Sequence, residues 1–403
     1  MKIRNILLAG PILFAGFFSD SPALAAWIGR AEAETIALNW AGRQWPDRSR
    51  GAGIKNITPE KTGGPAALYI VNLEGGGFVL VGGNELAYPV LGYSPSGKIE
   101  ESGTTPAFKA IVTSYRTQIE LAARSLDKDA GIQAQWKELR APAAGKKTKG
   151  AIEAVMPLLA REGKANAWGQ DAPYNKFTPP EGGQPTHAGC GAVSMAQIMW
   201  HWKHPRQGSG SHDGIDFGSA LYDWELMPRA LSPVSSPEEI DAVALALRHA
   251  GASIGTRYHA GEQPSLAYQG DIAGALRGYF GYNAEYRDDF IGPAGLARSA
   301  LVLKEELDTI PDAGIPPDYT GRPVQFNALK PAGHAFVCDG YENRGAPGDA
   351  PHKFYFHFNF GWSGADDGYF LLSAIGPVHG GDATFIPNYK INYRIYPADG
   401  SLR

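Results

Sequence analysis

The pattern of polar and apolar positions divides the first 140 residues into a small α+β unit. Residues Ala31–Trp45 are rich in alanine and glutamate with few helix breakers, which predicts a helix. Two strands are expected over Ala66–Leu73 and Phe78–Val81, because a Glu-Gly-Gly-Gly turn separates them. A third strand is expected from Tyr88 into a turn at Gly97, and a long helix from Pro106 to about Leu126.

The rest of the chain places helices before strands. One helix begins at Cys190 and is ended by Pro205. Another begins after Ser236, an N-cap residue followed by proline and two acidic residues, and runs to His249. Aromatic-rich strands are expected over Ala335–Tyr341, Phe354–Phe360 and Tyr369–Leu372.

A polar, basic stretch separates the two units. Residues Ala141–Gly150 contain three lysines and nothing that a core would bury, which is typical of an exposed linker that proteases reach easily. A surface loop within one domain is the alternative. We expect a signal peptide over 1–25, an N-terminal unit over 26–149 and a second domain over 150–403.

The first 25 residues are typical of a secretory signal peptide. Lys2 and Arg4 precede an apolar run from Ile6 to Phe18, and Ala23-Leu24-Ala25 supplies the small-x-small pattern that signal peptidase accepts. The run is shorter than the about 20 residues that a membrane-spanning helix needs. We therefore expect export to the periplasm or the medium, without a membrane anchor.

Composition is that of an ordinary soluble globular protein. Hydrophobic residues make up 43% of the 403 positions and charged residues 19%, so the chain has room for two domains and a sizeable core. The formal net charge of -4 gives no reason to expect nucleic acid or an anionic membrane as a partner. No metal and no organic cofactor is implied.

Candidate chemistry centres on Cys190, at the start of a predicted helix. Glycines flank it on both sides, and amide N–H groups and the positive end of the helix dipole would stabilise its thiolate. The pKa of a thiol, about 8.5 when free, would then fall toward neutrality, as a nucleophile requires. The alternative is a small buried apolar residue.

A nucleophilic thiol needs a base within hydrogen-bonding reach and a group that orients the base. His334 opens a predicted strand after a Pro-Ala-Gly turn, so its imidazole can stand at the end of the sheet. Asn359 ends the following strand, and we expect it to return to the level of His334 and to hold the imidazole in one tautomer. The indole of Trp362 would shield that hydrogen bond from water.

Gln170 supplies a fourth element. Its side-chain N–H, together with the backbone N–H of Cys190, would form an oxyanion hole. The four residues follow one another in the order found in papain-like cysteine proteases. The 144 positions from Cys190 to His334 also agree with their spacing of about 130–150 residues.

The local sequence resembles the streptopain family of secreted cysteine peptidases, and the resemblance covers nearly the whole chain. The matching positions are Gly189, Cys190, Ala196 and Gln197 around the cysteine, Gly333–Tyr341 around the histidine, Gln170 with Pro173–Asn175, and Tyr222–Trp224. In the N-terminal unit, Gly76–Val81 and Pro89–Ser94 resemble the family's propeptide. The resemblance implies a papain-like α+β catalytic domain preceded by an α+β inhibitory propeptide domain.

A secreted cysteine endopeptidase, made as a zymogen, is the function that the resemblance implies. Protein or peptide substrates and its own propeptide would be its partners, and cleavage around Lys146–Lys149 would release activity. A hydrophobic residue would be preferred one position before the residue that bears the scissile carbonyl. Two alternatives stay open: an exported non-catalytic binding or inhibitor protein on the same fold, and a transglutaminase-like acyl transferase.

Two features depart from the family's pattern. Its Asn-Trp-Gly-Trp-Gly-Gly run reads Asn359–Gly364 here, with Phe360 in place of one indole. Its glycine-rich loop near the C-terminus is represented only by Gly376–Gly381.

Cys338 is the second of the two cysteines, and a disulfide between them would exclude the catalytic role of Cys190. His334 and Cys338 lie four strand residues apart, a distance of about 13 Å. A disulfide needs Cα atoms within about 7 Å, so Cys190 cannot bond Cys338 and contact His334 together. We expect Cys338 to be a buried, unbonded core residue.

Overall fold

A computed structural model of the chain describes most of its residues. The described ranges are 26–46, 53–61, 63–100, 103–124, 128–142, 153–161, 163–290, 292–309, 320–328, 333–376 and 389–398. The predicted signal peptide and most of the predicted linker lie outside them. Within these ranges, none of the helices has the length and apolar character needed to cross a membrane.

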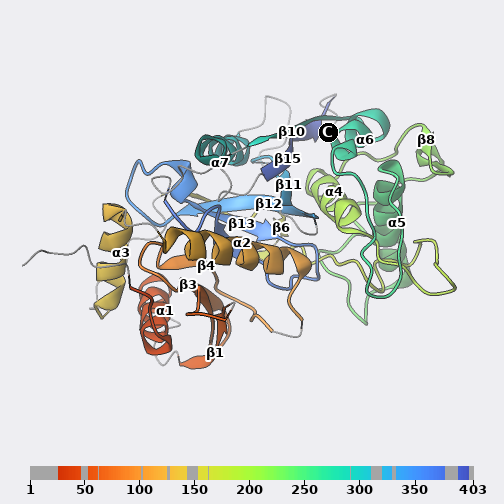
Figure 1. Ribbon diagram of the computed structural model, residues 1–403. Helices are drawn as coiled ribbons and strands as arrows, with labels where there is room; N and C mark the ends of the chain where they lie inside the picture. The colour runs from red at the N-terminus through yellow and green to blue at the C-terminus, as the bar shows by residue number, and fades with distance from the viewer. Residues whose placement is uncertain are drawn as a thin grey trace, which may run out of the picture.

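The described residues of the N-terminal part, within 26–142, form three helices and four strands (Figure 1). They are α1 (Arg30–Gln44), β1 (Ile54–Glu60), β2 (Leu68–Leu73), β3 (Phe78–Gly82), β4 (Val90–Ser94), α2 (Pro106–Ala122) and α3 (Ala130–Arg140).

The C-terminal part, residues 153–398, carries four helices and the remaining strands. The helices are α4 (Cys190–Trp202), α5 (Pro237–Ser253), α6 (Asp271–Phe280) and α7 (Gly292–Asp308), with short 3-10 turns over Phe217–Ser219 and Pro351–Lys353. The strands are β5 (Glu153–Val155), β6 (Ala160–Arg161), β7 (Lys164–Ala165), β8 (Ser211–His212), β9 (Ile215–Asp216), β10 (Tyr282–Phe290), β11 (Val324–Ala328), β12 (His334–Asn343), β13 (Tyr355–Asn359), β14 (Gly368–Leu371) and β15 (Tyr389–Pro397).

Each helix and strand predicted above is confirmed, with ends shifted by a few residues. Helix α5 illustrates why: Ser236 Oγ accepts from the Glu239 N–H at 3.2 Å, and the Glu239 carboxylate accepts from the Ser236 N–H at 2.9 Å. Pro237 occupies the first helical position. This capping box satisfies two otherwise unpaired donors and fixes where the helix begins.

One sheet runs through both parts of the chain. Its strands follow the order β1-β2-β3-β4-β14-β13-β12-β11-β15-β10, with β5 paired to β12 off this path. The two parts join where β4 pairs antiparallel with β14, Tyr93 opposite Tyr369 and Gly92 opposite Phe370. The predicted N-terminal unit and the second domain are therefore hydrogen-bonded into a single sheet.

The two parts also share a hydrophobic core. One cluster of buried side chains includes Phe78 and Phe108 from the N-terminal part and Phe370 from β14. The rings of Phe78 and Phe108 lie 6.2 Å and 6.1 Å from that of Phe370. The N-terminal part is thus not a separate body with a core of its own.

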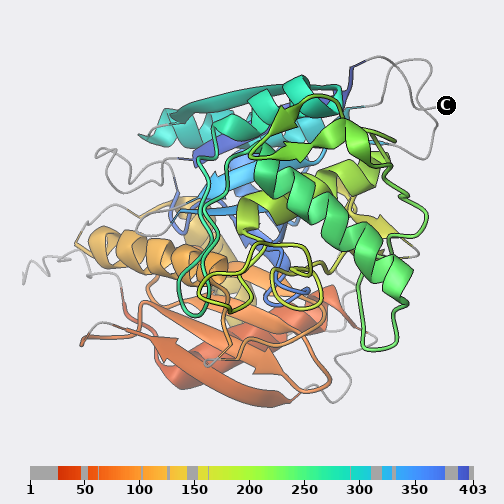
Figure 2. The same ribbon diagram turned by 90° about the vertical axis from the view of Figure 1, so that its right-hand side faces the viewer.

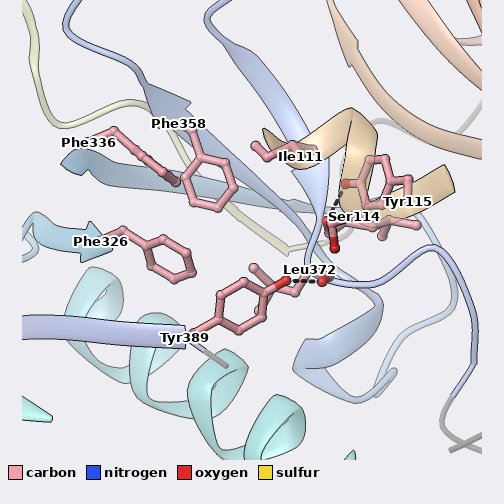
Figure 3. A pocket seen from close by; sticks show the side chains of 9 residues that line it. Ile111, Ser114, Tyr115, Phe326, Phe336, Phe358, Leu372 and Tyr389 are labelled. Atoms are coloured by element: carbon pink, nitrogen blue, oxygen red, sulfur yellow. Dashed lines mark hydrogen bonds between the residues drawn. The ribbon is translucent and has the colours of Figure 1, made fainter. Parts of the chain in front are cut away.

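Helix α2 covers the aromatic face of the sheet (Figure 3). Its residues Ile111, Ser114 and Tyr115 face side chains from the five strands β11 to β15, and the Tyr115 hydroxyl donates to the Leu371 carbonyl. A cavity of about 10 Å³ remains between them, which is room for no more than about one water molecule. The interface is packed as tightly as a domain interior.

A second core surrounds α4, which is buried from Gly191 to Trp202. The helices coloured green, α4 and α5, occupy a region apart from the orange N-terminal part in both views (Figure 1, Figure 2). Along β12, Val337 joins the core around α4 while Phe336 and Cys338 join the shared core. Alternation of side chains along a strand therefore places β12 between the two cores.

Substitution of Gly92 tests the junction of the sheet. A Cβ at this position would lie 2.6 Å from Phe370 Cδ1 and 2.9 Å from the Tyr369 carbonyl oxygen. We expect Gly92→Ala to lower the free energy of unfolding by about 1–3 kcal/mol, the usual cost of overpacking. Urea unfolding followed by tryptophan fluorescence measures it.

Gly64→Ala is the matched control, because nothing lies within 4 Å of a Cβ there. Equal unfolding midpoints for the two variants would contradict the close approach of β4 and β14.

Candidate active site

Cys190 lies at the first position of α4, after a turn that only glycine forms easily. Gly189 has φ 91° and ψ 138°, outside the regions that other residues favour. A Cβ at Gly189 would lie 3.4 Å from Thr256 Cγ2 and 3.5 Å from Ser265 Cβ. The turn therefore presents the thiol at the helix N-terminus, as the sequence predicts.

His334, the first residue of β12, lies close enough to the Cys190 thiol to act on it through its charge and through hydrogen bonding. Burial would raise the pKa of Cys190, but the charge and hydrogen bond of His334 and the backbone amides of Ala335 and Gly191 outweigh it, so the pKa is lowered. The structure thus brings together the thiol and the imidazole that the sequence pairs, in surroundings that favour a thiolate.

Trp362 binds the other side of the imidazole. Its indole N–H donates to His334 Nε2 at 3.1 Å, and the two ring centroids are 6.2 Å apart. An indole N–H only donates, so Nε2 must offer its lone pair in this contact, which is therefore made by the neutral imidazole and is lost when His334 carries a charge. Nδ1 is the nitrogen left for the thiol. Trp362 contacts the imidazole directly, whereas we expected it only to shield another hydrogen bond.

Asn359 does not lie at the level of His334, and that expectation is wrong. It pairs with Val337 in the β12–β13 register. Strand β13 ends at Asn359, and the turn that follows it brings Trp362 to His334. Asn359 Oδ1 instead accepts from Gln197 Nε2 at 2.9 Å and from the Gly361 N–H at 3.1 Å.

Gln197 is a site-supporting residue to which the sequence analysis gave no role, although the family motif contains it. It is fully buried on α4, and its amide donates to both Asn359 and Asn166 Oδ1, the latter at 3.1 Å. Asn359 Nδ2 in turn donates to the Asn166 carbonyl at 2.6 Å. These bonds fix the turn that follows β13 and, through it, the position of Trp362.

Gln170 lies on a loop that is hydrogen-bonded to the segment just before Cys190. Its carbonyl accepts from the N–H of Ala188 at 2.9 Å, which ties its loop to the segment just before Cys190. Its side chain is buried, and Nε2 has no hydrogen-bond partner among the described residues. A buried amide N–H without a partner costs free energy, so we expect this donor to be available to an acceptor that binds next to it.

Both cysteines are free, and Cys338 is fully buried in the shared core. Burial raises the pKa of Cys338 well above its ordinary value. The prediction of an unbonded core cysteine is confirmed. Cys338 is thereby an inert thiol, in contrast to Cys190.

Phe360, which replaces an indole of the family pattern, belongs to the core. Its ring lies 5.2 Å from Phe336 and 5.7 Å from Phe370. Phe336 in turn lies 6.5 Å from the His334 ring, so Phe360 supports the imidazole from one layer further away. Of the predicted glycine-rich loop Gly376–Gly381, only its first residue is described.

A groove of about 1080 Å³ runs beside Trp362, between the two parts of the chain. Its lining includes Ser94–Gly97 of the N-terminal part and Trp362–Asp367 of the C-terminal part. At its edge, the N–H of Thr105 donates to Asp366 Oδ2 at 2.6 Å. Among the described residues, no cluster of three His, Cys, Asp or Glu could hold a metal ion.

Comparison with known protein families identifies the family of the chain. A model described as the Peptidase C10 family matches residues 168–370, just over half of the chain. The chain belongs to the peptidase C10 family. A second model, described as Spi protease inhibitor, matches residues 25–119 of this C10 peptidase.

Relatives with known names agree with the family. The thiol protease/hemagglutinin PrtT of Porphyromonas gingivalis is 27% identical over 92% of this chain, which spans 42% of the length of PrtT. Streptopain of Streptococcus pyogenes serotype M1 is 26% identical over 93% of each chain. The structure of a prointerpain A fragment from Prevotella intermedia superposes with a TM-score of 0.63 and 25% identity, covering 85% of this chain and 99% of the fragment.

These matches confirm the streptopain-like resemblance, the fold class and the activity. This C10 peptidase is a cysteine endopeptidase, and its N-terminal part is an inhibitory propeptide.

The lowered pKa of Cys190 can be tested by alkylation. In the full-length protein we expect the rate of Cys190 modification by iodoacetamide to rise with pH about a midpoint below 9, the reference value from which the pKa of Cys190 is lowered. In His334→Asn, the midpoint should move above 9, because burial then dominates. Mass spectrometry of the Cys190 peptide from pH 5 to 10 measures both rates.

His352→Asn, a histidine in the Pro351–Lys353 turn, serves as the control and should leave the midpoint unchanged. An unchanged midpoint in His334→Asn would show that His334 does not stabilise the thiolate.

Proposed function

We propose that Cys190 is the nucleophile of this endopeptidase and His334 its acid and base. The thiolate of Cys190 attacks the scissile carbonyl carbon, and the imidazolium of His334 protonates the leaving amine. Water then attacks the thioester, with His334 as the base, which regenerates the thiol. The hydrogen bond between the two side chains at the start of α4 supports this assignment most directly.

Gln170 would stabilise the oxyanion, together with the backbone N–H of Cys190. The observation behind this role is its buried, unpartnered Nε2 on a loop tied to Ala188. In the transition state the carbonyl oxygen becomes an alkoxide, and a fixed donor already turned toward it needs no reorganisation.

Trp362 and Asn359 would act as positioning residues. Trp362 holds the neutral imidazole, before it takes up the thiol proton, through its indole N–H. Asn359 acts one step further away, through the Gly361 N–H and the turn that carries Trp362. A Cβ at Gly361 would lie 2.9 Å from Val193 Cγ1, so only a residue without a side chain lets this turn pack so closely against α4.

The propeptide would inhibit by narrowing the groove beside Trp362 and by holding the sheet that carries His334. Ser94–Gly97 line that groove together with Trp362. The bond from Thr105 to Asp366 anchors the start of α2 next to the same loop. Release of the propeptide would open this side of the cleft to a polypeptide substrate.

We place the propeptide over 26–149 and the catalytic domain over 150–403. Strand β5 supports this boundary, since Val155 already pairs with Tyr341 in the catalytic sheet. Cleavage would fall around Lys146–Lys149, after removal of a signal peptide over 1–25 and export to the periplasm or medium. Substrates would be proteins or peptides with a hydrophobic residue one position before the residue that bears the scissile carbonyl.

Removal of the Gln170 side chain tests the oxyanion hole. We expect Gln170→Ala to lower kcat of the matured enzyme about 10²–10³-fold, the usual cost of one oxyanion donor. KM should stay within about twofold, because the donor acts in the transition state. Hydrolysis of a fluorogenic peptide measures both constants.

Gln207→Ala removes an exposed amide and should leave kcat unchanged. A Gln170→Ala enzyme with the kcat of the wild type would end this assignment.

Self-processing tests the nucleophile. Under reducing conditions, the purified full-length protein should convert to a form that begins between residues 143 and 152, whereas Cys190→Ala should remain full length. Cys338→Ala removes the other thiol and should still mature. Electrophoresis with N-terminal sequencing follows the reaction, and maturation of purified Cys190→Ala would rule out Cys190 as the nucleophile.

A further inference from the structure

His187, three positions before Cys190, has an acceptor at each of its two ring nitrogens. Nδ1 contacts Oδ1 of Asp171, and Nε2 lies 2.7 Å from the carbonyl oxygen of Gly261. The side chain is 24% exposed. None of the catalytic steps proposed above uses this residue.

The protonation state of His187 follows from its two partners. A backbone carbonyl has no proton to donate, and a carboxylate only accepts, so each ring nitrogen must carry a hydrogen. A neutral imidazole has one N–H and the imidazolium has two. Both contacts exist together only while His187 is positively charged.

The surroundings favour that charge. Burial would lower the pKa of His187, but the Gly261 carbonyl and the Asp171 carboxylate outweigh it and raise the pKa above the ordinary 6.5. The imidazolium, and with it both hydrogen bonds, is therefore present below the raised pKa and lost as the pH rises through it.

A second ion pair lies on the segment that carries Gly261. The ring of His259 contacts the Glu181 carboxylate at 3.1 Å, and the same carboxylate accepts from the Ala260 N–H at 2.9 Å. The carboxylate of Glu181 is thus already bound by two donors. Asp171 is the anion that pairs with His187.

Both acceptors of His187 belong to segments that border the active site. Asp171 directly follows Gln170, the proposed oxyanion donor. Gly261 belongs to the segment 256–269, which packs against the glycine turn of Cys190. Ser265 Oγ in this segment donates to the His187 carbonyl at 2.7 Å, so the segment also holds the main chain of His187.

We propose that His187 is a positioning residue whose imidazolium ties the Gln170 loop and the 256–269 segment to the turn of Cys190. Loss of its proton removes one of the two contacts, and Gln170 then holds its donor less firmly at the oxyanion. The proposal rests on the oxyanion role of Gln170 given above. It predicts a fall in kcat at alkaline pH that the Cys190–His334 pair does not cause.

The test is the dependence of kcat and KM on pH, from 5.5 to 9.5, for the matured enzyme. His187→Gln keeps one donor but does not titrate, so we expect kcat about tenfold lower at pH 6, no alkaline limb from this residue, and KM within about twofold. Asp171→Asn keeps an acceptor without the charge, so the alkaline limb should move to lower pH by about one unit. His352→Gln should leave the profile unchanged.

A double variant separates this proposal from the proposed function. In the Gln170→Ala background, His187→Gln should lower kcat less than about twofold, because the donor that it positions is gone. If Gln170→Ala alone leaves kcat unchanged, the oxyanion role is wrong. If Gln170→Ala lowers kcat but His187→Gln costs the same factor in both backgrounds, His187 does not act through Gln170.

Nitrogen NMR of the imidazoles in full-length Cys190→Ala reads the charge of His187 without any activity. The signal is assigned by its loss in the additional His187→Gln variant. We expect a doubly protonated ring at pH 6.5, and a lower pKa after Asp171→Asn. A ring that is neutral at pH 6 would overturn the proposal, whatever the kinetics of the variants.

Discussion

The burial of helix α4 is the constraint on which the active site depends. From Gly191 to Trp202 every residue of this helix is buried, so the Cys190 thiol is placed by everything that packs around it. Gln197 binds Asn359 from the same helix, and Val193 meets the turn at Gly361. Cys190, the proposed nucleophile, and the residues that support the imidazole therefore share one buried helix, so that a shift of α4 would move both.

The zymogen is built as one folded body. The propeptide adds four strands to the catalytic sheet, and α2 covers the aromatic face that includes Phe336. Phe336 stands two residues after His334, and the two rings are 6.5 Å apart. The propeptide thus packs on the strand that begins with His334, the proposed acid and base, which links inhibition to the packing of the core.

The sequence predicted the local elements and the Cys190–His334 pair because both follow from short motifs. A capping box, a glycine turn before a helix and a spacing typical of a family are local or pairwise signals. The partner of His334 depended on strand register, and here a shift between Cys338 and Gly340 and the turn after Asn359 decide the outcome. The sequence around Asn359 does not predict that register.

Pairings between distant segments were also beyond the sequence. Strand β4 pairs with β14, which lies about 277 positions later in the chain. The hydrophobic pattern of either strand is compatible with pairing to many other strands. The contacts of His187 with Asp171 and Gly261 join three separate loops. The sequence of each loop alone is typical of an ordinary turn. Such contacts follow from the tertiary arrangement, which single-sequence patterns do not encode.

Strand β14 has a neighbour on each side only while β4 is present. Any event that detaches residues 26–142 leaves β14 at the outer rim of the sheet, with unpaired backbone groups and with Tyr369 no longer stacked on Tyr93 at 5.4 Å. Bare strand edges of this kind recruit strands from other molecules. Release of the propeptide therefore exposes the enzyme to aggregation through the edge of β14. The concentration at which the released enzyme stays in solution is limited by how strongly this edge pairs with other molecules.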